Sequence, residues 1–217
     1  MSCPQCRGID AFFDAREAER DLARYRKKGP DKTTRMLLDA IGAEGVEGST
    51  LLDIGGGVGA IQHVLLEAGA SRAVSIDASQ AYIAAAKKEA ERQGLTERIQ
   101  QRFGDFVDLA PGVEAADIVT LDRVICCYHH VEKLVGLSSA KAKRMYAVVY
   151  PRDNWLFRLL VRPLNALSWV RRSPFRVFIH SSAVIEGLVT GNGLRRTYYR
   201  KTSVWQVAVY SRLAAAD

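Results

Sequence analysis

Residues 51–59 read Leu-Leu-Asp-Ile-Gly-Gly-Gly-Val-Gly, and this stretch decides the fold. Its apolar start, Leu51 to Ile54, is typical of a buried strand, and the following run, Ala60 to Ala68, has helical spacing. The glycines therefore lie in a turn between a strand and a helix. Nucleotides bind at such turns in doubly wound sheets, because glycine lets a ligand approach the backbone and the helix offers unpaired N–H groups. The stretch predicts a nucleotide site.

Short apolar runs alternate with helical segments beyond this turn, which predicts an α/β fold with a parallel, doubly wound sheet. We expect further strands at Ala73 to Ile76, Ile99 to Phe103, Asp117 to Leu121 and Met145 to Tyr150, and helices at Ser79 to Arg92 and Glu132 to Ala142. Two β-rich runs end the pattern, Tyr198 to Lys201 and Val204 to Tyr210. The short polar connection between them predicts an antiparallel hairpin.

Residues 1–49 precede this alternation and predict a helical cap. Helical spacing indicates one helix from Ile9 to Lys28, which the breaker pair Gly29-Pro30 ends, and a second from Lys32 to Ile41. Residues 50–217 form the main domain, with a basic and aromatic insertion at about residues 152–180.

Composition limits the class of protein. The 217 residues are 48% hydrophobic with a net charge of +7, which fits one globular domain and excludes disorder as the main state. The first twenty residues lack the apolar core of a signal sequence. Arg158, Arg162 and Pro163 interrupt the most apolar stretch, Trp155 to Val170, so we expect no membrane span. Four cysteines in two close pairs do not form a dense disulfide framework, which favours a reducing cytoplasm.

Acidic residues lie at the ends of the predicted strands. Asp77 ends the second strand, 24 residues beyond Asp53, where a carboxylate can accept hydrogen bonds from both ribose hydroxyls. Asp105 follows the third strand beside Phe106, an arrangement that suits an adenine amine and a stacked adenine ring. Asp122 ends the fourth strand. Carboxyl ends of parallel strands share one sheet edge, so these acids are expected to gather there.

The glycines also satisfy a dinucleotide-binding pattern, Gly55-x-Gly57-x-x-Ala60, so a nicotinamide or flavin enzyme is the rival interpretation. Asp53 separates the two. A carboxylate two residues before the first glycine would repel a pyrophosphate, but it suits the cationic amino group of a methionine moiety, directly or through water. S-adenosyl-L-methionine therefore fits the sequence better than NAD.

With these motifs in place, the sequence resembles the class I S-adenosylmethionine-dependent methyltransferases. The matching segments are LLDIGGGVG, VSIDAS, FGDF and ADIVTLDRV, within residues 50–150, and GLVTGNGL before the last hairpin. The resemblance implies a Rossmann-like, seven-stranded sheet, mostly parallel with a reversed C-terminal strand, and methyl transfer by direct displacement. It also implies a set of cofactor-binding residues: Asp53, Gly55, Gly57, Asp77, Asp105, Phe106, Leu121 and Asp122. The class methylates too many kinds of acceptor for the fold to name one.

The segment after the fourth strand bears on the acceptor. Leu121-Asp122-Arg123-Val124 stands where amino-group methyltransferases of DNA commonly carry an Asn- or Asp-Pro-Pro-aromatic motif, which argues against that activity. Cys126 and Cys127 lack the preceding proline of a cytosine-carbon nucleophile. We expect both cysteines to pack as small apolar residues.

Two residues are candidates for catalytic roles. His130, after the fourth strand, could remove the proton of a hydroxyl acceptor or hold a carboxylate, and its alternative role is to cap the next helix. Tyr25, on the N-terminal helix, could orient the cofactor or the acceptor. The run YRKKGPDKTTRMLL and the later histidine also resemble the magnesium-protoporphyrin O-methyltransferases of the chlorophyll pathway.

The insertion from Arg152 to Ile185 carries six arginines and one acid, Asp153, with interleaved tryptophan, phenylalanine and leucine. A helix with a core face explains part of this pattern. We expect a lid over the site or a segment that contacts an anionic surface. At the other end of the chain, the Cys3-x-x-Cys6 pair alone does not predict a zinc site, so no metal is expected.

The sequence thus predicts a cytoplasmic S-adenosylmethionine-dependent methyltransferase that acts on a small hydrophobic or anionic molecule, at oxygen. An RNA methyltransferase and a non-catalytic module that binds adenosyl nucleotides are the alternatives. The expected partner is a small-molecule acceptor. Peripheral contact with an anionic membrane surface is a further candidate, and nucleic acid ranks below both because no RNA-binding module is visible.

Overall fold

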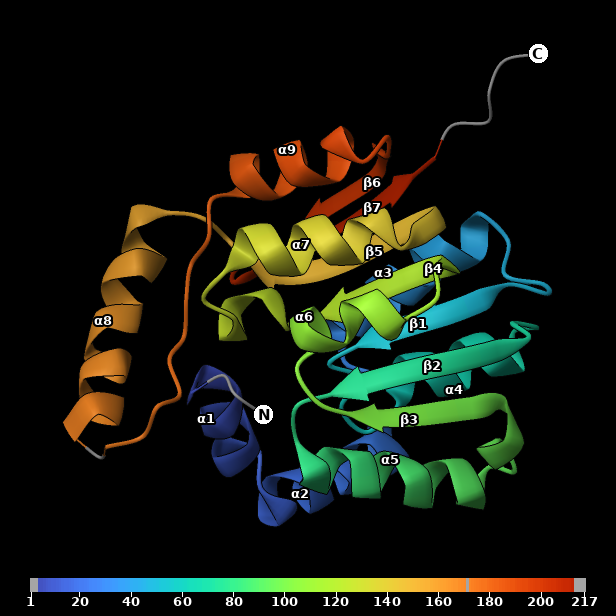
Figure 1. The fold of residues 1–217 in the computed structure, drawn as a ribbon, viewed down its shortest axis with the longest axis horizontal. Coiled ribbons are helices and arrows are strands. Elements are labelled where there is room, and N and C mark those ends of the chain that lie inside the picture. The colour runs from blue at the N-terminus through green and yellow to red at the C-terminus, as the bar shows by residue number, and fades with distance from the viewer. Residues whose placement is uncertain (1–3, 171, 213–217) are drawn as a thin grey trace.

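Seven strands form one sheet in the order β3-β2-β1-β4-β5-β7-β6 in the computed structural model, which describes residues 4–170 and 172–212 (Figure 1). The strands are β1 (Thr50–Ile54), β2 (Arg72–Asp77), β3 (Ile99–Phe103), β4 (Ala116–Asp122), β5 (Ala142–Pro151), β6 (Arg195–Lys201) and β7 (Trp205–Ser211). From β3 to β5 all neighbours are parallel, whereas β7 is antiparallel to both β5 and β6. The predicted sheet, with its reversed strand near the C-terminus, is confirmed.

Helices cover both faces of the sheet (Figure 1). They are α1 (Pro4–Phe12), α2 (Ala15–Lys28), α3 (Lys32–Ala43), α4 (Ala60–Glu67), α5 (Gln80–Arg92), α6 (Phe106–Leu109), α7 (Val131–Ala140), α8 (Trp155–Val170) and α9 (Ser182–Gly191). On β5, Val148 points into the core shared with α7 and α9, while its neighbours Ala147 and Val149 point into the core shared with α3 and α4. This alternation follows from the two-residue period of a strand, and it explains why strands buried on both faces read as continuous apolar runs.

The N-terminal segment differs from the prediction of one helix from Ile9 to Lys28. The structure has two helices there, because the Asp14 carboxylate accepts a hydrogen bond from the Glu17 N–H at 3.0 Å and begins α2 as its N-cap. Gly29, with φ of 69°, ends α2 as predicted. The next helix, α3, packs on β5 and β7, while α1 and α2 lie near the carboxyl ends of the strands.

Helix α8 lies at one end of the molecule, away from the sheet, and an extended segment returns the chain past α1 to α9 (Figure 1). We call this extended segment, residues 173–181, the strap. None of the side chains on α8 is buried. In the part of the chain that the structure describes, no helix has the length and apolar character needed to cross a membrane.

Candidate active site

The glycine turn after β1 requires glycine for two separate reasons. Gly55 has φ of 69° and Gly57 has φ of 56°, the left-handed region that other residues enter at a cost. A Cβ on Gly55 would also lie 2.3 Å from Cγ2 of Val124, which follows β4. A Cβ on Gly57 would meet only the Tyr82 ring, at 3.7 Å. The turn therefore packs tightly against the β4 loop at Gly55 and is open at Gly57.

Asp77 fixes the open part of the turn. Its Oδ2 accepts a hydrogen bond from the Gly57 N–H at 3.0 Å, and its Oδ1 accepts one from the Ser79 N–H at 2.8 Å. Burial raises the pKa of Asp77 to about 6, although these N–H groups act in the opposite direction. The carboxylate lies at the end of β2 and lines the cavity described below, the position expected for a group that accepts from ribose hydroxyls.

Asp53 lies beneath the turn and is 1% exposed. Its carboxylate accepts hydrogen bonds from the Thr120 hydroxyl at 2.6 Å and from Gln62 Nε2 at 3.0 Å. Burial raises the pKa of Asp53 to about 6, against the effect of these two donors. These hydrogen bonds join the end of β1 to β4 and α4. Asp53 also lines the cavity, and its contact with a methionine amino group stays a prediction.

Asp105 and Phe106 both line the cavity, as expected for an adenine site. The structure adds contacts that local sequence does not indicate. Asp105 accepts hydrogen bonds from the Val107 N–H at 2.9 Å, from the Tyr128 hydroxyl at 2.9 Å and from the Cys6 thiol at 3.2 Å. The first of these makes Asp105 the N-cap of α6. The other two join this carboxylate to the β4–α7 loop and to α1.

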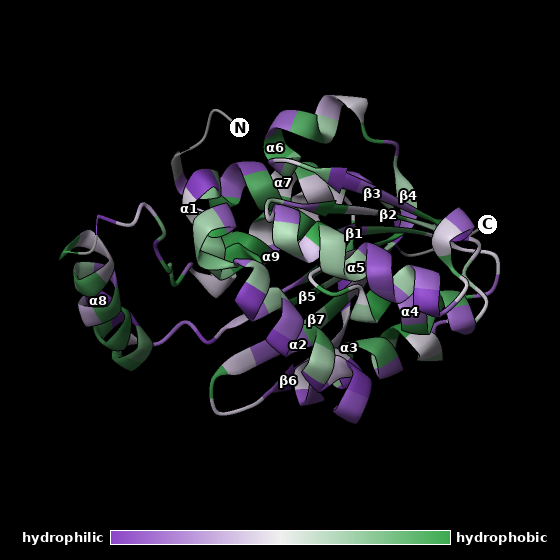
Figure 2. Ribbon diagram, turned by 90° about the horizontal axis from the view of Figure 1, so that it is seen from below, coloured by the Kyte–Doolittle hydropathy of each residue, from purple (hydrophilic) through white to green (hydrophobic). Residues whose placement is uncertain are grey.

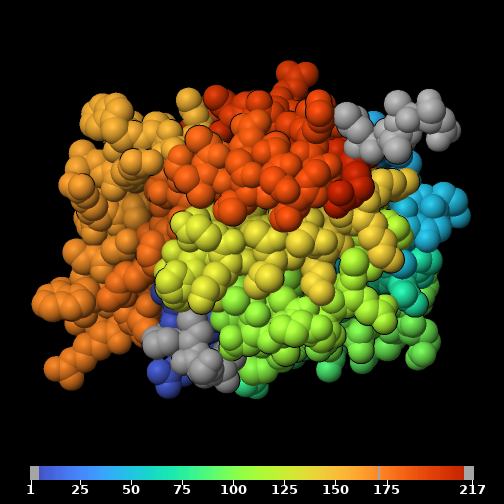
Figure 3. Space-filling model, turned by 45° about the horizontal axis from the view of Figure 1, so that its top comes forward, coloured from blue at the N-terminus to red at the C-terminus, as the bar shows by residue number. Residues whose placement is uncertain are grey.

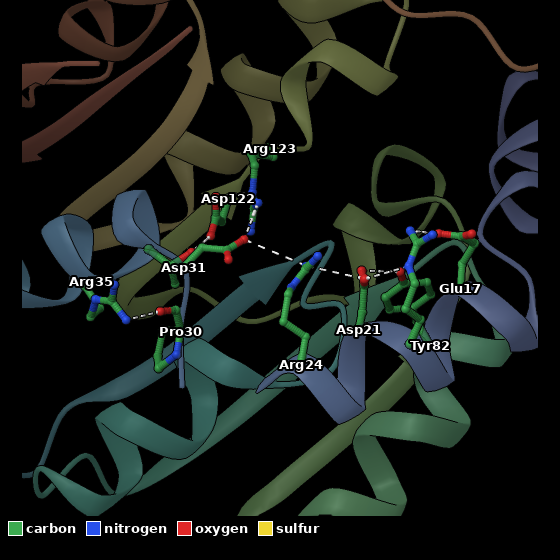
Figure 4. A network of polar contacts seen from close by, with 11 residues as sticks. Glu17, Asp21, Arg24, Pro30, Asp31, Arg35, Tyr82, Asp122 and Arg123 are labelled. Carbon is green, nitrogen blue, oxygen red and sulfur yellow. Dashed lines mark hydrogen bonds and ion pairs between the residues drawn. The ribbon is translucent and has the colours of Figure 1, made fainter. Parts of the chain in front are cut away.

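Asp122 belongs to a network of charged side chains (Figure 4), and it lines the cavity together with Asp31 and Arg123. It accepts hydrogen bonds from the Thr34 hydroxyl and from Arg123 Nε, the latter at 3.1 Å, and Arg123 Nη1 donates to Asp31 at 2.7 Å. The charge and hydrogen bond of Arg123 outweigh burial and lower the pKa of Asp31. Arg123 itself has φ of 62°. This arrangement ties the start of α3 to the end of β4.

One cavity of about 510 Å³ contains these groups, a size that suits a cofactor and a small ligand. At one end it is lined by the glycine turn and by Asp77, Asp105 and Phe106. The remaining lining includes Phe12, Phe13, Arg24, Tyr25, Asp31, Arg123, Cys126, Cys127, Tyr128, Phe175 and Val177. Of the predicted cofactor residues, Asp53, Gly55, Gly57 and Asp122 also line it, and Leu121 lies buried just behind Asp122.

The two predicted catalytic residues have different positions. Tyr25 lines the cavity from α2, packs against the buried cluster that includes Leu22 and Tyr82, and has its ring centroid 5.8 Å from that of His63. His130 is exposed, occupies the N-cap position of α7 and is absent from the described lining. The His129 ring lies beside it, with ring centroids 4.0 Å apart and the ring planes tilted by 47°. The structure therefore brings Tyr25 to the cavity that the predicted cofactor residues line. It leaves His130 outside this cavity, at the N-cap position of α7 but without a side-chain capping hydrogen bond.

The sequence offered the insertion as a lid over the site, but it did not indicate which other segment the insertion contacts. Phe175 of the strap is buried and stacks on Phe12 of α1 at 4.4 Å, so two distant segments close one side. Cys126 and Cys127 also reach the lining instead of lying wholly in the core. The aromatic residues of the insertion indicated that it packs on another part of the protein. Nothing in the sequence indicated that Phe12 of α1 is the residue it contacts.

No metal centre emerges from the residues that the structure describes, because they contain no group of three or more His, Cys, Asp or Glu side chains arranged for an ion. Cys6 donates to Asp105, and Cys3 lies outside the described residues.

Cofactor binding should weaken as the pH falls through the pKa of Asp77. Protonation near pH 6 removes the charge that accepts from ribose hydroxyls, so affinity should drop about tenfold for each unit below that pKa. Calorimetric titration of S-adenosylmethionine between pH 7.5 and 5 (about 1.5 units above to 1 unit below) measures this slope. The Asp77→Asn variant should give a shallower profile, and the slope that remains belongs to Asp53, whose pKa is also raised to about 6. A flat profile in the unmodified protein would contradict the prediction.

Comparison with known proteins agrees with this geometry. The family model described as "Methyltransferase domain" matches residues 46–158. Ribosomal protein L11 methyltransferase of Edwardsiella ictaluri is 30% identical over 127 residues, 55% of this chain and 43% of that protein. Erythromycin 3''-O-methyltransferase of Saccharopolyspora erythraea is 31% identical over 118 residues, 54% of this chain and 32% of that protein. The matches therefore span less than half the length of these two relatives.

Among solved structures, magnesium protoporphyrin IX methyltransferase from Synechocystis PCC 6803 with bound SAH superposes with a TM-score of 0.74. The identity is 18%, with 96% of this chain and 100% of that chain covered, so the likeness concerns the fold. The chain belongs to the methyltransferase domain family. The class expected from the sequence, the class I S-adenosylmethionine-dependent methyltransferases, is confirmed, and S-adenosylmethionine is the cofactor of that class.

Proposed function

We propose that this protein transfers a methyl group from S-adenosylmethionine to an oxygen of a small, largely apolar molecule, and that this oxygen belongs to a carboxylate. One observation carries the proposal. A single cavity joins the glycine turn and Asp77 to an aromatic wall made by Phe12 and Phe175, and its lining also includes Arg24 and Arg123. Such a cavity can hold a cofactor and an apolar acid together.

The residues present fit the cofactor. Gly57 leaves open space where a Cβ would stand, and the start of α4 offers unpaired N–H groups beside it. Asp77 can accept from ribose hydroxyls, and Phe106 lies where an adenine ring would stack. When bound, the cofactor supplies a methyl group that its sulfonium already activates, so the protein has mainly to hold the acceptor oxygen in line with it.

The acceptor side favours an acid over a hydroxyl compound. No histidine lines the cavity among the residues that the structure describes, and Asp31 and Asp122 are both bonded to Arg123. A hydroxyl acceptor needs a group that takes its proton, whereas a carboxylate is already ionised at neutral pH. Arg24 and Arg123 are the basic side chains in the described lining, and a ligand carboxylate would share them with the acids they already pair with: Arg24 with Asp21 and Asp31, and Arg123 with Asp31 and Asp122. With a carboxylate acceptor, the protein has only to hold the acceptor oxygen in line with the methyl group, and no general base is needed.

The test uses purified protein, S-adenosylmethionine labelled in its methyl group, and matched pairs of apolar carboxylic acids and alcohols. Acids should accept label as methyl esters, which release labelled methanol in mild alkali, whereas ethers do not. Transfer to alcohols alone would overturn the carboxylate assignment. Transfer to RNA or to protein, with none to small molecules, would overturn the proposal.

Replacing His130 with alanine should leave turnover of the accepted acid within about twofold, because the side chain is exposed outside the cavity. Initial rates across pH 6 to 8 (about half a unit below to 1.5 units above an ordinary histidine pKa) provide the measurement. A loss of about 10²–10⁴-fold, the range expected for a general base, would instead place His130 in the mechanism.

A further inference from the structure

Helix α8 carries an apolar face that points away from the protein. Its inner row of side chains is partly buried toward the body of the protein. This row, with spacings of four, four and three residues, consists of Phe157, Val161, Asn165 and Ser168. Seven exposed apolar residues lie outside this row, and we call them the apolar face: Trp155, Leu156, Leu159, Leu160, Leu164, Leu167 and Val170. Their exposed fractions run from 46% at Leu156 to 75% at Trp155. Much of α8 is green in Figure 2, the colour of hydrophobic residues, and the helix stands apart from the body.

Positive charge borders this face. Arg158 and Arg162 lie on α8, Arg172 follows it, and all three are exposed. The helix itself contains no acid. Asp153, just before it, binds Arg158 at 2.7 Å and is the one acid among residues 152–185. The segment that projects from the molecule in Figure 3, in orange, therefore combines exposed apolar residues with a surplus of arginine.

We propose that α8 docks on the surface of an anionic lipid bilayer and lies in the plane of the interface. Its 16 residues extend about 24 Å, shorter than the roughly 30 Å hydrocarbon core, and its arginines also exclude a span. Trp155 and Trp169, which are 75% and 73% exposed, stand near its two ends and suit the headgroup region. A symmetric pair of α8 helices would set like-charged arginines near one another, so an anionic surface complements this face better than a second copy does.

The docking surface is joined to the cavity. The Asn165 amide donates to the Val177 carbonyl at 2.8 Å and accepts from the Val177 N–H at 2.9 Å, so α8 holds the strap directly. Phe175, two residues before Val177 in the strap, lines the cavity. Bilayer contact would bring this cover to the lipid surface, which allows an apolar acid to enter from the membrane. That last step rests on the proposed function, whereas docking itself does not.

Vesicle flotation tests docking without cofactor or acceptor. The full chain is mixed with vesicles of phosphatidylcholine alone, or of phosphatidylcholine and phosphatidylglycerol in equal amounts. It should float with the mixed vesicles, and tryptophan emission should shift to shorter wavelength because Trp155 and Trp169 leave water. Raising the salt to about 1 M, which shortens the Debye length to about 3 Å, should reduce binding.

Two variants separate the apolar and charged contributions. Leu156→Ser with Leu160→Ser and Leu167→Ser should weaken binding at least about 100-fold. Its control replaces three apolar residues that are exposed elsewhere, in the changes Leu137→Ser, Val184→Ser and Val204→Ser, and should bind normally. Replacing Arg158, Arg162 and Arg172 with Gln should cost about fivefold each, roughly 100-fold together, on mixed vesicles. The same change at Arg16, Arg195 and Arg200, which removes equal charge, should have little effect.

Three results would overturn the proposal: no flotation with mixed vesicles, equal loss in the control variants, or a dimer that the leucine variant abolishes while vesicles go unbound. Sedimentation velocity detects the last of these. Circular dichroism should give the same spectrum for every variant, because all the replaced side chains are exposed. If vesicles bind and no small acid accepts a methyl group, docking stands and the proposed acceptor fails.

Discussion

The protein with alanine in place of Gly55 should bind S-adenosylmethionine at least about 100-fold more weakly than the unmodified protein. The new Cβ would lie 2.3 Å from Val124 Cγ2, so either the turn or the β4 loop must move. The positive φ of Gly55 adds about 1–2 kcal/mol for a residue with a side chain. Calorimetry measures the affinity, and thermal unfolding shows whether the fold persists.

A double variant distinguishes the two causes. Gly55→Ala combined with Val124→Ala removes the 2.3 Å contact, leaves the Val124 Cβ at 3.3 Å and keeps the strained φ, so affinity should return to within about tenfold of the unmodified protein. Val124→Ala alone is the control. Normal binding by the Gly55→Ala protein would show that the turn tolerates the side chain and that its packing against β4 does not shape the site.

Replacing Asp77 with alanine should weaken binding of the same cofactor by about 1–3 kcal/mol, which is roughly 5- to 150-fold. The change removes an acceptor for ribose and also releases the Gly57 and Ser79 N–H groups. NAD should give no detectable heat with either protein. Affinity is measured by calorimetry with S-adenosylmethionine and with its demethylated product.

Asp117 offers a matched control for this experiment. Its carboxylate also accepts two hydrogen bonds, from the N–H and the hydroxyl of Thr50 at 2.8 and 2.7 Å, but it lies near the start of β4, away from the cavity. Asp117→Ala should lower the unfolding temperature and leave cofactor affinity unchanged. An equal loss of affinity in both variants would mean that Asp77 acts through stability alone.

The sheet and its carboxyl edge were predictable because their signals are local. The two-residue period of strands, the glycines at 55–57 and the acid that ends β2 are all contained in short windows of sequence. Asp77 ends β2 and Phe106 follows β3, so their position at this edge could be predicted from the sequence, whereas their contact with an adenosine stays a prediction. These residues line the cavity.

The contacts between distant segments were not predictable. Cys6 and Tyr128 bind Asp105 from 99 and 23 residues away, and no local pattern indicates such partners. His130 follows a strand at the expected place, but the chain turns there to begin α7 and leaves its ring in solvent. The break before α2 was missed because helical spacing continues across Asp14, whose capping hydrogen bond depends on one side chain.

The aromatic contact between Phe12, Phe13 and Phe175 joins two covers that come from opposite ends of the chain. The Phe13 carbonyl also accepts a hydrogen bond from the Ser79 hydroxyl, and the N–H of the same serine donates to Asp77. A ligand that orders α1 therefore also orders the strap, and a ligand that orders the strap also orders α1. Thermodynamic linkage then makes the effect mutual: the factor by which bound cofactor tightens the acceptor equals the factor by which bound acceptor tightens the cofactor.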